Sequence, residues 1–167
     1  NFLSNSSCAL MLDGEIVYVG QEERFCRFKN ITGFPHKALT YGFKKFNIDG
    51  SCIEKVGFST KSFDPLMIKA SFMQNTTMRD FHDYYGSGYW HRIFAGQDCN
   101  DYFRWIRDAE KFNKHDGIFD YSFIDDDLLG DVNQRIVMYR TYLTQHLQKY
   151  FNIPEDRVKF LDHHTCH

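Results

Sequence analysis

CALMLDGEIVYVGQ, residues 8–21, is the stretch that decides the fold of this chain. Both halves are apolar and rich in residues that favour strands, and they meet at Asp13-Gly14, a dipeptide suited to a tight hairpin turn. The pattern therefore predicts two antiparallel strands, 8–14 and 15–21. The short apolar run at residues 1–3 fits the end of an earlier strand, so we expect that the natural chain begins before it.

The segment that follows the hairpin predicts a helix and a further strand. Residues 33–48 carry Pro35 at a position suited to the first helical turn, followed by apolar residues at the i, i+4 and i+7 spacing of one helix face. After a turn-like Asp-Gly-Ser, residues 52–60 are apolar and predict a short strand. The expected order is hairpin, helix, strand.

The C-terminal part predicts a long helix and another strand. Asp131 is a suitable N-cap with Gln134 three residues on, and the helix is expected to end before Pro154. Its predicted buried face consists of Val132, Ile136, Tyr139, Leu143, Leu147 and Tyr150. Residues 157–162 then predict a strand, and a helix followed by a strand implies a parallel crossover. The expected fold class is α/β, with an antiparallel hairpin leading into a mixed sheet with crossover helices.

Residues 61–130 are rich in aromatic residues, Gly and Asp, and have helix-like pieces at 65–73 and 100–112. We interpret this region as a mostly helical insertion. Aromatic residues such as Trp90 and Trp105 favour a packed core, because aromatic side chains at helical spacing are usually buried. A partner-binding surface formed by residues 84–112 is the alternative.

Composition narrows the class of protein. The 167 residues are 43% hydrophobic and carry a formal charge of -2, which predicts a packed domain without the basic field of a nucleic-acid-binding protein. Five cysteines without a CxxC pair favour reduced thiols over a disulfide framework or a zinc ribbon. No apolar run approaches the roughly 20 residues of a membrane helix. A cytoplasmic protein that does not contact membranes is expected.

DHHTCH, residues 162–167, is the first candidate site. If the chain becomes helical after Asp162, His163 and His167 lie one turn apart on one face and can share a metal ion, while His164 points elsewhere. Imidazole suits zinc, iron or nickel. Asp162 would either orient an imidazole or cap the helix. The alternative is a solvated, histidine-rich tail, although the preceding strand argues against an expression tag.

QEERFCRFKN, residues 21–30, is the second candidate site. Arg24 and Lys29 can pair with phosphate oxygens, Arg through its fork and Lys as a point charge. A solvated charged edge is the alternative interpretation.

SNSS, residues 4–7, stands just before the hairpin and offers small polar side chains that can cradle a phosphate. Asn5 and Ser6 are the candidates. An ordinary polar strand end is the alternative.

Three motifs occur in a family order: DGEIVYVGQEERFCRFKN at 13–30, GFPHKAL at 33–39 and DHHTCH at 162–167. Together they resemble the nodulation-type O-carbamoyltransferase family, over about residues 2–60 and 150–167. The family has an EERFxRxK segment after a DGxI hairpin, then an FP before a helix, then HHxxH. Three ordered matches are more specific than any one of them.

The resemblance implies an actin-like ATPase, ribonuclease H-like fold. It implies a transferase that moves a carbamoyl group from carbamoyl-adenylate, made from carbamoyl phosphate and ATP, to a hydroxyl of a small-molecule acceptor. In members of that family, the histidines that correspond to His163 and His167 bind a metal, commonly iron, together with an aspartate far downstream. Residues 1–167 are then the N-terminal part of the actin-like domain, with the 61–130 insertion and without the C-terminal adenylate-forming domain, and are expected to be inactive alone.

One departure separates the chain from this family. Ser4, Asn5 and Ser6 stand where the family has His-Asp-Ser, so no residue is assigned as the catalytic base. Two alternatives stay open: another actin-like ATP-using transferase or kinase, and a non-catalytic binding module on the same scaffold. The assembly state, including a homo-oligomer, is open as well.

Overall fold

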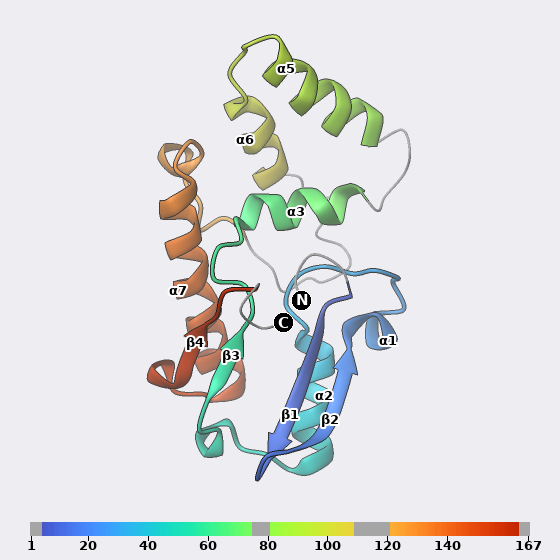
Figure 1. Ribbon diagram of the computed structural model, residues 1–167, viewed down its shortest axis with the longest axis vertical. Helices are drawn as coiled ribbons and strands as arrows, with labels where there is room; N and C mark the ends of the chain where they lie inside the picture. Colours follow the sequence, from blue (N-terminus) through green and yellow to red (C-terminus); the bar gives the residue numbers. More distant parts are fainter. Residues whose placement is uncertain (1–4, 75–80, 109–120, 164–167) are drawn as a thin grey trace.

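The computed structural model of the chain is a mixed α/β structure and describes residues 5–74, 81–108 and 121–163. Strands β1 (Ser7–Leu12) and β2 (Glu15–Gln21) form an antiparallel hairpin (Figure 1). Asp13 and Gly14 form the turn with φ of 50° and 85°. Positive φ at both central positions matches the twist of the strands, which is why Asp-Gly suits this turn. The predicted hairpin is confirmed.

One face of the hairpin packs on helix α2 (His36–Phe46). Leu10 and Tyr18, cross-strand partners, are both buried there, and the Tyr18 hydroxyl donates to the Ala38 carbonyl over 2.9 Å. Gly42 allows this close approach, because a Cβ at that position would lie 2.7 Å from the Tyr18 ring. The predicted helix is confirmed, although Pro35 is its N-cap residue and lies just outside it.

A second sheet pairs β3 (Val56–Phe58) with β4 (Val158–Phe160) in parallel. The rings of Phe58 and Phe160 stack with centroids 5.2 Å apart. The parallel pair expected from the crossover is confirmed. The strand expected over 52–60 is shorter than predicted, since Cys52 belongs to the short 3-10 helix η1 (Gly50–Cys52) and β3 begins at Val56.

Within the described residues the strands form two separate two-stranded sheets. The single mixed sheet expected from the sequence is therefore wrong for this part of the chain. Strands β3 and β4 are three residues long each, so they offer few backbone groups for a wider ladder.

Helix α7 (Val132–Phe151) leads from the region 61–130 to β4 through the short helix η5 (Glu155–Arg157), as Figure 1 shows. It begins as predicted, since the Asp131 carboxylate accepts from the Gln134 backbone N–H over 3.0 Å. The centre of the predicted buried face is confirmed, whereas Val132 and Tyr150 at its ends are exposed. The buried residues are Arg135, Ile136, Tyr139, Leu143, His146, Leu147 and Phe151.

The region 61–130 is mostly helical where it is described, as predicted. It contains α3 (Pro65–Gln74), the π-helix η2 (Phe81–Trp90), α5 (His91–Phe94), α6 (Asn100–Asp108) and η4 (Asp126–Leu128). In Figure 1, α3, α5 and α6 lie beyond one end of the hairpin and the parallel pair. No helix among the described ranges is long and apolar enough to span a membrane.

A buried ion pair fastens the start of α3 to α7. Arg135 is 1% exposed, and its Nε donates to a carboxylate oxygen of Asp64 over 3.0 Å. Its Nη1 donates to the Leu128 carbonyl over 3.0 Å, and its guanidinium lies 5.5 Å from the centre of the Phe103 ring. One side chain of α7 thereby contacts the residue before α3, a ring of α6 and the end of η4.

Candidate functional site

The DHHTCH segment begins directly beyond the carboxyl end of β4. There the Leu161 N–H donates to the Phe58 carbonyl over 2.7 Å, and the Lys61 N–H donates to the Leu161 carbonyl over 3.0 Å. These bonds keep the two parallel strands side by side past their ends. His163 follows at once, half-buried, with its ring centre 6.0 Å from that of Phe63. The structure therefore places this predicted ligand at the strand end, the position where open α/β sheets bind ligands.

The predicted partner of this imidazole, His167, lies outside the described residues. The described chain contributes the His163 imidazole and the half-buried Asp162 carboxylate, donor types that iron and zinc accept. No three side chains of His, Cys, Asp or Glu lie close enough together to bind one metal ion within the described residues 5–74, 81–108 and 121–163. His163 and Asp162 fit a metal chemically, and further ligands would have to come from residues outside those ranges.

Ser6 is fully buried and connects three segments. Its hydroxyl donates to the Gly33 carbonyl over 2.6 Å, and its N–H donates to the Ile31 carbonyl over 2.9 Å. Its own carbonyl accepts from the Glu22 N–H over 2.8 Å. Asn5 next to it is exposed and has a left-handed φ of 51°. Of the two residues predicted to cradle a phosphate, Asn5 therefore faces solvent, while Ser6 uses its hydroxyl proton within the protein.

Helix α1 (Glu22–Cys26) follows β2 and starts with a buried carboxylate. The Glu22 side chain accepts from the backbone N–H groups of Lys37 over 3.1 Å and Ala38 over 2.8 Å, in the first turn of α2. Burial raises the pKa of Glu22, and these two bonds oppose that rise. Because Pro35 has no side-chain oxygen, Glu22 serves as the cap of α2 from a distance.

The sequence analysis did not predict this role of Glu22, because the residue is part of the charged segment 21–30. The available signal was indirect: a helix that starts at Pro-His carries no capping side chain of its own, so an acceptor from elsewhere is needed.

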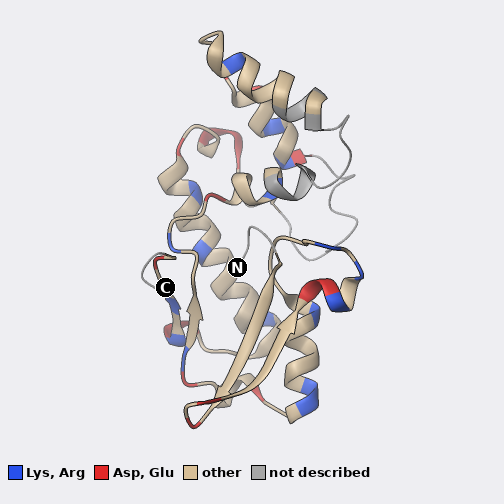
Figure 2. Cartoon of the chain, turned by 45° about the vertical axis from the view of Figure 1, so that its right-hand side comes forward, with Lys and Arg blue, Asp and Glu red and all other residues tan. Residues whose placement is uncertain are grey.

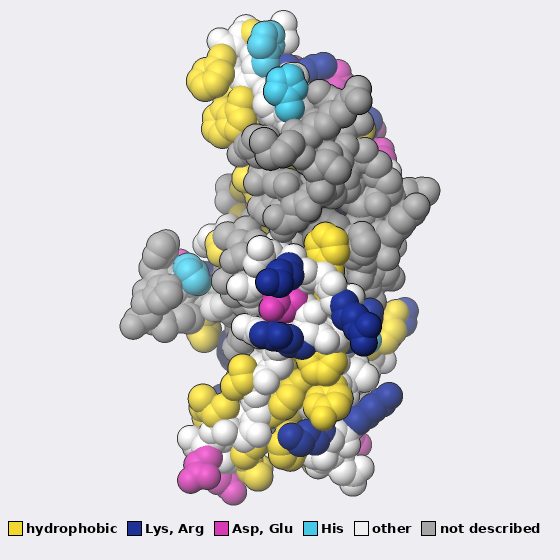
Figure 3. All heavy atoms as spheres, turned by 90° about the vertical axis from the view of Figure 1, so that its right-hand side faces the viewer, with side chains coloured by type: hydrophobic (Ala, Val, Ile, Leu, Met, Phe, Trp, Pro, Cys, Tyr) yellow, Lys and Arg dark blue, Asp and Glu magenta, His cyan; other side chains and the backbone are white. Residues whose placement is uncertain are grey.

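Arg24 and Lys29, the predicted phosphate-binding cations, are exposed on and after α1. The Arg24 side chain is 77% exposed, with its Nε 3.8 Å from the Glu23 carboxylate. Figure 2 shows acidic and basic residues next to each other on α1, and Figure 3 shows cationic side chains around an acidic one on this face. The backbone bond between Ser6 and Glu22 brings the 4–7 and 21–30 segments together, whereas His163 follows β4 of the other sheet.

Two histidines that the sequence analysis did not single out form a close pair. His36 Nδ1 lies 3.2 Å from His146 Nε2, which joins the start of α2 to α7. Phe34 and Tyr150 flank the His146 ring at centroid distances of 4.9 and 4.5 Å. Burial holds the pKa of His36 below its usual value and that of His146 at about 4. Because the two histidines are 110 positions apart in the sequence, no local pattern predicts this pair.

Family models, curated proteins and solved structures provide no match to this chain.

Proposed function

We propose that this chain is part of an O-carbamoyltransferase. The reaction joins a substrate hydroxyl to the carbamoyl carbon of carbamoyl-adenylate. The bond from that carbon to the phosphate oxygen breaks, AMP leaves, and the hydroxyl proton passes to a base. Carbamoyl phosphate and ATP are the precursors of the adenylate. The protein group that takes the proton is not assigned.

The observation that carries the proposal is the position of Asp162 and His163. They follow the carboxyl end of β4 beside its parallel neighbour β3, where α/β sheets commonly bind ligands. The arrangement of the two candidate phosphate-binding segments supports it as well, since 4–7 and 21–30 meet at the Ser6–Glu22 hydrogen bond. We propose that Asn5, Ser6, Arg24 and Lys29 serve the phosphate-bearing substrates, with Ser6 acting by holding Asn5 in place.

We propose that His163 and His167 hold the metal, iron in preference to others. A metal ion bound there would polarise an acyl or phosphoryl oxygen as a Lewis acid. The imidazole of His163 would supply one nitrogen ligand, and the Phe63 ring beside it would limit the rotation of that imidazole.

The test is exchange of labelled pyrophosphate into ATP by the full-length protein, with and without carbamoyl phosphate. Adenylate formation is reversible, so we expect exchange only when carbamoyl phosphate is present. An actin-like kinase would transfer the γ-phosphoryl group and show no such exchange. Exchange that is absent, or independent of carbamoyl phosphate, would count against the proposal.

A second candidate, a non-catalytic binding module, is favoured by the exposed apolar residues of α5. Phe94 is 84% exposed, its ring is 5.9 Å from that of Trp90, and Ile93 beside it is exposed as well. Exposed apolar clusters of this kind often mark binding surfaces. Under this alternative, Phe94→Ser would remove a partner detected by crosslinking in the source cell, and the full-length protein would show no pyrophosphate exchange.

A further inference from the structure

Helix α2 presents an exposed tyrosine among three lysines. Tyr41 is 48% exposed, and Lys37, Lys44 and Lys45 are exposed as well. The lysines stand four residues before Tyr41 and three and four residues after it. On a helix these positions are neighbours on one face, with Cβ atoms about 5–6 Å apart. The buried residues of α2 lie on its other side, toward the hairpin.

Aromatic rings from two further elements stand beside this tyrosine. The Tyr41 ring centre lies 5.2 Å from that of Phe25 in α1 and 6.0 Å from that of Tyr18 in β2. Phe46 at the end of α2 is 38% exposed, and its ring centre lies 5.3 Å from the Lys45 ammonium. Figure 3 shows apolar side chains among Lys and Arg side chains on this face. We define the Tyr41 surface as Phe25, Lys37, Tyr41, Lys44, Lys45 and Phe46.

The three lysines of the Tyr41 surface have no carboxylate partner in the described part of the chain. None of the ion pairs there includes Lys37, Lys44 or Lys45. Helix α2 contains no Asp or Glu, as Figure 2 shows. Like charges three and four residues apart on a helix repel each other. Carboxylates bound from outside would relieve this repulsion.

Helix stability accounts for two of these lysines but not for the third. Lys44 and Lys45 lie in the last turn of α2, where the helix dipole favours cations. Lys37 lies in the first turn, where the dipole disfavours a cation. The nearby Glu22 carboxylate offsets part of this cost, but it is 4% exposed and already accepts from two backbone N–H groups. Recognition of an anion accounts for all three lysines.

The charge of the chain favours a short acidic ligand over a long polyanion. Residues 22–46 include six Lys and Arg and two Glu, a formal charge of +4, whereas the whole chain carries -2, so the remainder carries -6. That remainder repels an extended polyanion such as a nucleic acid or an anionic membrane. A short acidic segment interacts mainly with the local cations, because salt screens charges beyond about 8–10 Å.

We propose that the Tyr41 surface binds an acidic segment of a partner protein that carries an aromatic or aliphatic side chain beside its carboxylates. The carboxylates pair with Lys37, Lys44 and Lys45, and the apolar side chain packs on Tyr41 and Phe25. None of these residues is assigned to carbamoyl transfer, so neither proposal depends on the other.

The test is an NMR titration of the isotope-labelled full-length protein with two short peptides of equal negative charge. One has Trp and Leu among its Glu residues, and the other has Ser in their place. We expect the first peptide to shift the amides of Tyr41 and Lys45 and to bind at least about tenfold more tightly than the second. Equal affinities, or no shift at these amides, would overturn the proposal. Tighter binding of oligodeoxythymidylate or phosphatidylserine vesicles at the same amides would overturn it as well.

Variants identify the residues that bind the peptide. The combined change of Lys37, Lys44 and Lys45 to Gln and the single change Tyr41→Ala should each weaken the Trp- and Leu-containing peptide at least about tenfold. The matched control combines Tyr150→Ala with Lys149→Gln.

This control removes another exposed tyrosine and its lysine, whose ammonium lies 5.0 Å from the ring centre, from α7. It should bind the peptide as the parent protein does. An equal loss in the control, or parental affinity in the α2 variants, would contradict the assignment, and the amide spectra show whether each variant is folded.

Discussion

The His36 and His146 side chains join two helices through ring nitrogens 3.2 Å apart. At that distance one ring donates an N–H and the other accepts it with a lone pair, so the contact requires that the two rings are not both protonated. Lys37 and Lys149 add positive charge near the pair, which also disfavours its protonation. The pair therefore makes the packing of α2 on α7 sensitive to acid.

We predict that His146 makes the protein less stable in acid. Its folded pKa of about 4 lies below the usual histidine value of 6.5. The unfolded chain thus binds the extra proton first, and the contribution is complete above about pH 6.5 and lost as the pH falls toward 4. The difference corresponds to at most about 3 kcal/mol.

Urea unfolding at pH 7 and pH 4.5 measures this effect. His146→Phe should lower the pH dependence of the unfolding free energy between these values, whereas His91→Gln, which changes an exposed histidine of α5, should leave it as in the parent protein. A His146→Phe protein with the parental pH dependence would show that the pair does not titrate in this way.

Glu22 should stabilise the protein by capping α2. Glu22→Ala removes the acceptor of the Lys37 and Ala38 N–H groups and should lower the free energy of unfolding by about 1–3 kcal/mol. Glu22→Gln keeps an oxygen acceptor, so it should cost less. Glu15→Ala, at an exposed position of β2, is the control and should change stability by under about 0.5 kcal/mol. Equal losses for the two alanine variants would rule out the capping role.

The Arg135–Asp64 pair should be much more sensitive to truncation than a surface pair. Asp64→Ala leaves the buried guanidinium without its carboxylate and should cost about 3–5 kcal/mol. Asp101→Ala removes an exposed carboxylate 2.9 Å from Arg104 and should cost under about 1 kcal/mol. Denaturant unfolding of the two variants compares them directly. Similar costs would mean that water reaches the Arg135 site after the substitution.

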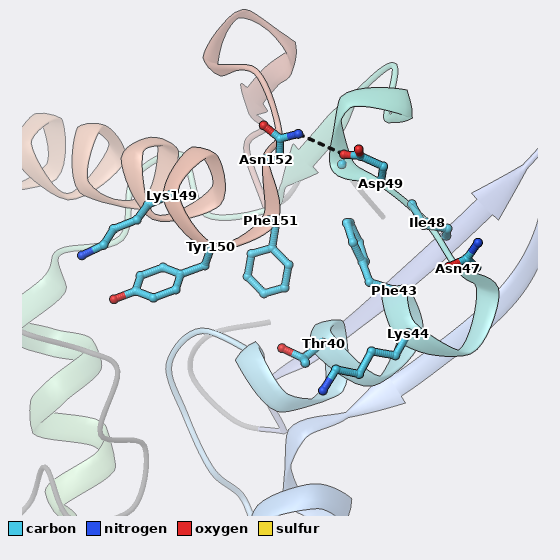
Figure 4. A pocket seen from close by; sticks show the side chains of 11 residues that line it. Thr40, Phe43, Lys44, Asn47, Ile48, Asp49, Lys149, Tyr150, Phe151 and Asn152 are labelled. Atoms are coloured by element: carbon cyan, nitrogen blue, oxygen red, sulfur yellow. Dashed lines mark hydrogen bonds between the residues drawn. The ribbon is translucent and has the colours of Figure 1, made fainter.

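Local features of the fold could be predicted from the sequence because their causes are local. Asp13-Gly14 requires a backbone conformation found in hairpin turns, and Asp131 offers a carboxylate to the first turn of α7. The centre of α7 was predicted from its apolar spacing. Its ends were not, because Tyr150 is exposed in the open pocket lined by residues of α2 and α7, whereas Phe151 beside it fills the core (Figure 4).

Contacts between distant segments could not be predicted in this way. Glu22 caps a helix that begins 14 residues later in the sequence, and His36 meets His146 only because α2 and α7 pack together. For the candidate site, the sequence located His163 at a strand end. It did not show that Ser6 would be buried with its hydroxyl bonded to Gly33, since that depends on the path of residues 31–33.

Iron binding by the full-length protein tests the central claim, a metal held by the imidazoles of His163 and His167. Calorimetric titration with Fe²⁺ under anaerobic conditions should show that His163→Ala and His167→Ala each weaken binding by about tenfold or more. His164→Ala should bind as the parent does, since a helix beginning after Asp162 would direct that side chain away from the other two. Parental affinity in the His163→Ala protein, or an equal loss in His164→Ala, would contradict the claim.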